Sequence, residues 1–221
     1  MLVTPQGTLE PGQPPHPVLR IGATLVSWLL HPLLLIVWVV VYLLFENPNI
    51  FLGWLPDNKV LVLLRIMSTS VFLPLITVLL LKGLGFVQSI RLETRKERIV
   101  PIIASLTFFF WSYYVSKQLN DPPELRAFLL GLFVSACSAL VMNNYFKVSL
   151  HTLGAGGMLA FFTLLLLSAQ LQSGGWYMGI LLAAGSIGSA RLLLRQHTAF
   201  DVYMGYFMGM VIQVVSWWIV G

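Results

Sequence analysis

Charged residues are scarce in this chain. Only 10% of its 221 residues are Asp, Glu, Lys or Arg, whereas 57% are hydrophobic. Soluble domains carry about 25% charged residues, which help to cover their surface. The segment from Val148 to Ala190 contains none of these four residue types. The composition therefore excludes a soluble globular protein and predicts an integral membrane protein.

Cysteine is nearly absent too, and proline and glycine are unevenly spread. Cys137 is the one cysteine and lies in an apolar run, which excludes an internal disulfide and a thiolate metal site. Proline and glycine are concentrated before about Leu19. We therefore expect residues 1–20 to form a disordered tail and residues 21–221 to form a single membrane-embedded domain.

Long apolar runs fill the rest of the chain. A helix needs about 20 apolar residues to cross a bilayer. The sequence predicts an all-α, polytopic membrane helix bundle with about six to seven transmembrane helices. The candidate spans are Ile21–Phe45, Val60–Leu84, Ile99–Ser116, Ala127–Phe146, Leu150–Leu171, Trp176–Leu194 and Phe200–Val220.

Three polar segments separate these spans, at residues 91–98, 147–151 and 191–201. An even number of predicted crossings separates each segment from the next, so all three should emerge on one face of the membrane. Ionisable groups beside membrane helices are costly and mark functional sites by default. The shared face makes one composite site possible.

The last segment carries the most specific pattern. Arg191, His197 and Asp201 arrive together after the uncharged stretch. Arginine and histidine are side chains that bind phosphate. Asp201 follows His197 by four residues, one helical turn, and so lies within reach of the imidazole ring. This segment predicts a phosphate site.

The order and spacing of the three segments resemble the type 2 phosphatidic acid phosphatase superfamily, which includes lipid phosphate phosphatases and is related to vanadium haloperoxidases. The matching positions are Arg91 and Arg98 with Pro101, then Ser149 and His151, then Ser189, Arg191, His197 and Asp201. The chain departs from the family pattern where Val148 replaces a proline, Leu150 replaces a glycine and Arg91 replaces a lysine. Pro101 and Ser189 are also displaced along the chain from their usual places.

The resemblance implies a role for each residue. His197 would attack phosphorus and form a phosphohistidine, with Asp201 orienting its ring, and His151 would protonate the leaving oxygen. The phosphoryl oxygens would be held by Arg91, Arg98 and Arg191, with a further donor from Ser149. Lys147 lies outside the family pattern, and we interpret it either as another phosphate contact or as a lysine that snorkels to the interface.

The resemblance also implies the partners. We expect a lipid phosphate or polyprenyl pyrophosphate as substrate, membrane lipids as surroundings and no nucleic acid. No metal or other cofactor is expected, because the arginines supply the positive charge. The location expected is a bacterial inner membrane, with the site on the extracytoplasmic side.

Two other functions remain open at this point. The departures at Arg91, Val148 and Leu150 are compatible with an inactive lipid-binding or transport protein of the same fold. His151 and His197 could instead be the axial ligands of a membrane cytochrome. We expect structural roles for two further residues. His31 is interpreted as a hydrogen-bond partner in helix packing, and Arg95 as an anchor that sets the membrane topology.

Overall fold

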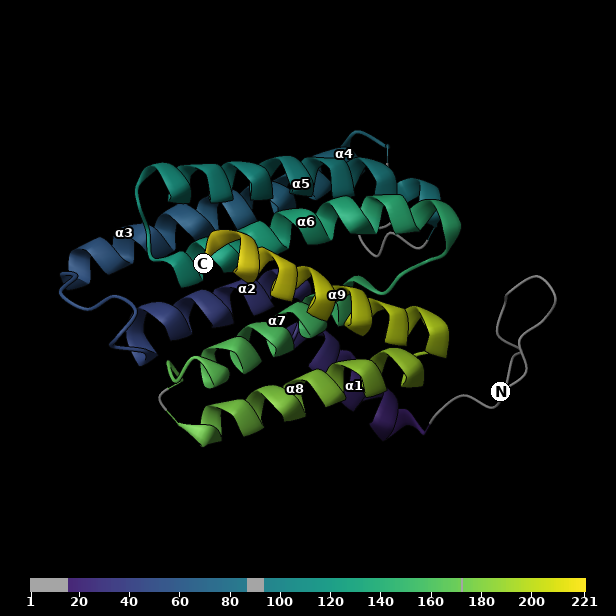
Figure 1. The fold of residues 1–221 in the computed structure, drawn as a ribbon. Helices are drawn as coiled ribbons and strands as arrows, with labels where there is room; N and C mark the ends of the chain where they lie inside the picture. Colours follow the sequence, from purple (N-terminus) through teal and green to yellow (C-terminus); the bar gives the residue numbers. More distant parts are fainter. Residues whose placement is uncertain (1–15, 87–93, 172) are drawn as a thin grey trace.

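The chain folds into an all-α bundle, shown in Figure 1 by a computed structural model that describes residues 16–86, 94–171 and 173–221. Among these residues, six helices are long and apolar enough to cross a membrane. The predicted fold class is therefore confirmed, and the protein is an integral membrane protein. The helices are α1 (Pro17–Leu29), α2 (Pro32–Val41), η1 (Tyr42–Glu46, a π-helical turn), α3 (Pro56–Met67), η2 (Ser68–Phe72, also π-helical), α4 (Leu73–Gly83), α5 (Arg95–Gln118), α6 (Pro123–Tyr145), α7 (Leu150–Leu167), α8 (Gly174–Leu193) and α9 (Ala199–Val220).

The first predicted span, Ile21–Phe45, is broken in the structure. Helix α1 and the α2–η1 helix meet at an angle of 55°. Pro32 has no N–H to donate and disfavours helical backbone at the residue before it, so His31 is extended, with φ −64° and ψ 143°. Helix α1 begins at Pro17, so the end of the predicted tail is helical, while residues 1–15 lie outside the described residues.

The second predicted span is continuous despite its proline and its arginine. Residues 56–83 form one 28-residue membrane helix, and the π-helical turn η2 lies just before Pro74. Arg65 forms an ion pair with Asp121, which is 1% exposed and also accepts a hydrogen bond of 2.6 Å from the Ser116 hydroxyl. The charge of Arg65 inside the span is therefore compensated by a partner, as the membrane interior requires.

Helix α7 lies at the centre of the bundle and contacts α9, α8, α2 and α6. The side chains of Phe161, Phe162 and Leu165 on this helix are at most 1% exposed and pack against buried residues of α2, η1, α6 and α8. A helix surrounded by others needs no polar face, which accounts for the absence of charge along α7.

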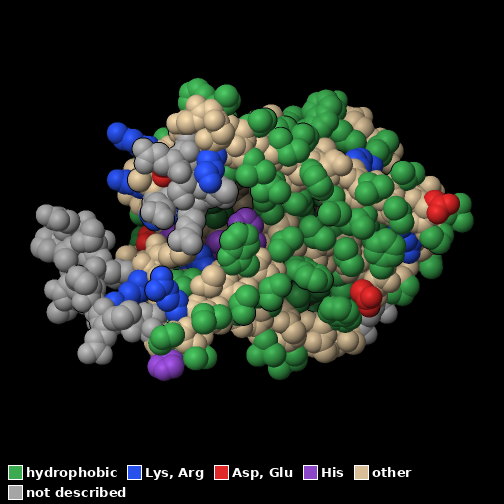
Figure 2. Space-filling model, turned by 180° about the vertical axis from the view of Figure 1, so that it is seen from behind, with side chains coloured by type: hydrophobic (Ala, Val, Ile, Leu, Met, Phe, Trp, Pro, Cys, Tyr) green, Lys and Arg blue, Asp and Glu red, His purple; other side chains and the backbone are tan. Residues whose placement is uncertain are grey.

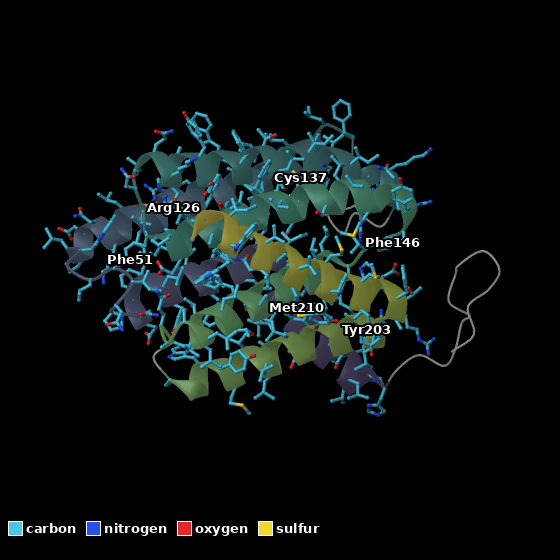
Figure 3. All side chains as sticks on the ribbon, viewed as in Figure 1. Phe51, Arg126, Cys137, Phe146, Tyr203 and Met210 are labelled. Atoms are coloured by element: carbon cyan, nitrogen blue, oxygen red, sulfur yellow. The ribbon has the colours of Figure 1, made fainter. Side chains whose placement is uncertain are left out.

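The two ends of the bundle differ in charge. Figure 2 shows the bundle from behind. Most of the Lys and Arg side chains visible in this view lie at one end of the bundle, with histidine side chains beside them. In Figure 3, Phe146 and Tyr203 lie toward this end, whereas Phe51 and Arg126 lie toward the other. The end near Phe146 is also the end where α7 and α9 begin, so the predicted phosphate site belongs there.

Candidate active site

Close packing of α7 against α9 sets the position of the site. A Cβ atom on Gly209 would lie 2.1 Å from the Leu153 carbonyl oxygen, and one on Gly205 would lie 2.2 Å from the Thr152 hydroxyl oxygen. On the other helix, a Cβ on Gly156 would lie 2.3 Å from the Tyr206 carbonyl oxygen. These glycines let the two backbones touch, and the contact brings the first turns of α7 and α9 together.

Replacing Gly209 with alanine should push α9 away from α7, because the new methyl group would meet backbone atoms that cannot rotate aside. We expect an unfolding free energy lower by about 1–3 kcal/mol, the usual cost of overpacking, and a loss of function. Thermal unfolding in detergent measures the first effect. Gly179→Ala is the matched control, since a Cβ at Gly179 in α8 would meet nothing within 4 Å. An equally small loss of stability in Gly209→Ala and Gly179→Ala would contradict the close packing of α7 against α9.

Polar side chains close the first turns of both helices. The Ser149 hydroxyl accepts a bond of 3.4 Å from the Thr152 N–H at the start of α7. At the start of α9, the Thr198 hydroxyl accepts from the Asp201 N–H, while the Asp201 carboxylate accepts from the Thr198 N–H and hydroxyl at 2.9 and 2.8 Å. The Ser149 N–H also donates to the Asp201 carbonyl oxygen at 3.4 Å. The two helix N-termini therefore meet, and each favours an anion nearby.

His197 lies in the loop before α9 and is 7% exposed. Its Nδ1 is 3.0 Å from the Lys147 carbonyl oxygen, so Nδ1 carries the proton and Nε2 is the basic nitrogen. Burial, together with the charges of Arg98 and Lys147, lowers the pKa of His197 to about 3. The ring is therefore neutral at physiological pH, the form in which it is a nucleophile.

The predicted contact between Asp201 and the His197 ring is wrong in this structure. The Asp201 carboxylate is taken up by the Thr198 capping box, and the His197 ring is oriented by the Lys147 carbonyl instead. The physical reason is that the third residue of a helix is well placed to bond back to its N-cap. The four-residue spacing that suggested a side-chain contact with His197 also places Asp201 at this capping position.

Arg98 is the part of the first segment that the structure brings into the site. It lies in the first turns of α5, is 7% exposed, and donates from Nη1 to the Val148 carbonyl oxygen at 3.0 Å. The charge of Asp201 acts on its guanidinium group. Arg91 of the same segment falls outside the described residues. Arg95 donates to the Asn144 and Tyr145 carbonyl oxygens at the end of α6, where a cation suits the helix dipole.

Arg191 comes from the last turn of α8 and is 5% exposed. Its guanidinium donates to the Gln196 side-chain oxygen at 2.6 Å and to the Ser27 hydroxyl. Its Nε has no hydrogen-bond partner among the described residues. A buried arginine with an unfilled donor fits a site that takes up an anion. Ser189, by contrast, is exposed and bonds to the Gly185 carbonyl at 2.9 Å, so it points away from the site.

His151 lies in the first turn of α7, two residues after Ser149. Its Nε2 is 3.3 Å from the Ser27 carbonyl oxygen. The positive charge of Arg191 acts on both His151 and His197, so the three side chains share one polar region. The charge of Lys147 also acts on His197, which places this lysine beside the ring whatever its further role.

Sequence reasoning missed two members of this region, Ser27 and His31. Ser27 contacts Arg191 and His151, as described above, and the His31 ring packs edge-on against His151 with the centroids 5.2 Å apart. A serine inside an apolar run has no distinctive signal. His31 did have a distinctive sequence signal, because it precedes a proline within a predicted membrane span. A proline there favours a break in the helix, and the break leaves polar groups of the backbone and side chains available.

The described residues contain no group of three or more His, Cys, Asp and Glu side chains that could hold a metal ion. The positive side chains Arg98, Arg191 and Lys147 are the charges that surround His197. No family model, curated protein or solved structure matches this chain.

Proposed function

We propose that this membrane protein is a phosphatase that hydrolyses a lipid phosphate or a polyprenyl pyrophosphate through a phosphohistidine intermediate. One observation carries the proposal. His197 is buried where the charges of two arginines act on it, is held neutral, and has its Nδ1 bonded to a carbonyl, so that Nε2 is left as the nucleophile. A neutral imidazole beside buried guanidinium groups is the arrangement that in-line attack on a phosphoryl group requires.

The reaction proceeds in two displacements. In the first, a bond forms between Nε2 of His197 and phosphorus while the bond to the ester oxygen breaks. The protonated ring of His151 gives that oxygen its Nδ1 proton, because its Nε2–H is held by the Ser27 carbonyl. Arg98 and Arg191 bind the phosphoryl oxygens, whose charge grows in the transition state. In the second, water attacks phosphorus with His151 as the base, the N–P bond breaks, and phosphate leaves. The Lys147 carbonyl accepts from Nδ1 throughout and stabilises the charge on the phosphorylated ring.

The depth of the site supports a lipid substrate. Arg98, His151 and Arg191 lie within a turn or two of the ends of membrane-spanning helices. A phosphate on a lipid headgroup lies at this depth, while its acyl or prenyl chain remains among the apolar side chains. Because the sites of lipid phosphate phosphatases generally face away from the cytoplasm, we further propose a bacterial inner membrane with the site on the extracytoplasmic side.

Phosphate release from a panel of lipid phosphates tests the proposal. We expect hydrolysis to be undiminished by EDTA, since the arginines offset the phosphoryl charge. Vanadate should inhibit, because a trigonal-bipyramidal adduct on His197 imitates the transition state, and such analogues bind at least about 10²-fold more tightly than substrate.

Three outcomes would contradict this proposal. An absolute requirement for a divalent metal with no effect of vanadate would point to different phosphatase chemistry. Lipid binding without turnover of any substrate would indicate a lipid-binding or transport protein. A visible haem spectrum of the purified protein would indicate a cytochrome with His151 and His197 as ligands.

A further inference from the structure

The junction between α1 and α2 has a polar residue at its break. His31 separates the two helices, and its Nδ1 accepts a bond of 3.3 Å from the Leu33 N–H, so the ring caps the start of α2. Because Nδ1 is the acceptor, a neutral His31 carries its proton on Nε2. The cap explains a polar side chain at this position, but it does not explain an aromatic ring.

The ring of His31 meets the ring of His151 edge-on, with the centroids 5.2 Å apart and the planes at 85°. This T-shaped contact is a favourable geometry between aromatic rings. The charge of Arg191 acts on both imidazoles. His31 is therefore in direct contact with the residue proposed as the general acid, although it lies about 120 positions away in the sequence.

The last turn of α1 supplies a second contact to the same ring. The Ser27 carbonyl oxygen lies 3.3 Å from Nε2 of His151, and the Ser27 hydroxyl accepts from Arg191. Helix α1 packs along α8, which carries Arg191. A hydrogen bond at Nε2 and a ring contact together restrict both side-chain torsions of His151, and both contacts come from the α1–α2 junction.

We propose that His31 is a positioning residue for His151 and that the α1–α2 junction is part of the active site. This inference rests on the proposed phosphatase function. His31 holds the plane of the His151 ring so that its proton reaches the leaving oxygen. General acids require this precision, since a misplacement of about 1 Å can cost about 10²-fold in rate.

Two substitutions separate positioning from capping. His31→Asn keeps the cap, because the asparagine oxygen can accept from the Leu33 N–H, but it removes the ring. His31→Phe keeps a ring against His151 and removes the cap. His16→Asn, an exposed histidine just before α1, is the control. Each variant is assayed on phosphatidate, whose alcohol leaves poorly, and on p-nitrophenyl phosphate, whose phenolate leaves easily without a general acid.

We expect His31→Asn to lower kcat on phosphatidate by about 10- to 100-fold, with KM little changed and p-nitrophenyl phosphate turnover spared. His31→Phe should retain more phosphatidate activity but unfold at a lower temperature. In a His151→Ala background, His31→Asn should cause no further loss, because it acts through His151. Normal turnover in His31→Asn, equal losses on both substrates, or losses that multiply in the double variant would overturn the inference.

A spectroscopic measurement separates this inference from the phosphatase proposal. If wild-type protein releases no phosphate from any substrate, the proposed function fails, but the contact between the rings can still be tested. In protein labelled with ¹⁵N-histidine, the ring-nitrogen shifts of His151 should change in His31→Asn and stay unchanged in His16→Asn. Unchanged His151 shifts in both variants would overturn the positioning role independently of any activity.

Discussion

Substituting His197 with alanine should abolish phosphate release and leave the fold intact. No neighbouring side chain can replace the Nε2 nucleophile, and loss of a nucleophile typically costs on the order of 10⁴-fold or more in kcat. The fold should survive, because among the described residues the His197 side chain contributes one hydrogen bond, to the Lys147 carbonyl, worth about 1 kcal/mol. Phosphate release and thermal unfolding, measured on the same detergent preparation, test both halves of this prediction.

His197→Asn is the sharper companion variant. The asparagine amide nitrogen can occupy the position of Nδ1 and donate to the Lys147 carbonyl, but nothing replaces Nε2. This variant should unfold like the wild type and still be inactive. The phosphoenzyme should be stable to alkali and lost in acid, as expected for phosphorus bound to an imidazole nitrogen, and it should be absent in both variants. Near wild-type turnover in His197→Ala would show that the assigned mechanism is wrong.

His151→Ala should behave differently from His197→Ala. A general acid contributes about 10²- to 10⁴-fold, and its contribution shrinks as the leaving group improves. The variant should therefore lose most activity on phosphatidate and keep part of it on p-nitrophenyl phosphate. A loss independent of the leaving group would reassign His151 to binding.

The second large effect should come from the two buried arginines. Arg98→Lys and Arg191→Lys preserve the charge but remove the planar fork of donors, so both should lower activity strongly. Each lost charge-assisted hydrogen bond is worth about 1.5–3 kcal/mol, which corresponds to roughly 10- to 100-fold in rate. Arg191→Lys should also disturb the hydrogen bonds of the guanidinium to Ser27 and Gln196.

Arg95→Lys is the matched control for these variants. Arg95 lies three residues before Arg98 on the same helix, but it bonds to the Asn144 and Tyr145 carbonyls at the end of α6, and a lysine can donate to either. We expect nearly normal activity. Equally small losses of activity at Arg95, Arg98 and Arg191 would contradict the phosphate-binding role and would indicate that these residues only set the membrane topology.

Much of the fold could be predicted from the sequence, because the membrane imposes a simple rule. A long uncharged run such as residues 148–190 has to satisfy its backbone hydrogen bonds internally, so it forms helices. The prediction was weaker where proline intervened. Pro32 follows an extended residue and breaks its span, whereas Pro74 follows the π-helical turn η2 within a continuous helix, and the spacing of prolines in the sequence does not distinguish the two cases.

The sequence by itself determined that the chain is a membrane helix bundle and that three polar segments leave it on one side. Both results follow from composition and from counting crossings. Only the tertiary structure decided the hydrogen-bond partners within the site. The ring of His197 is oriented by the Lys147 carbonyl and that of His151 by the Ser27 carbonyl. Every residue has a main-chain carbonyl, so no residue type reveals which one is used, and the choice depends on how α1, α7 and α9 pack together.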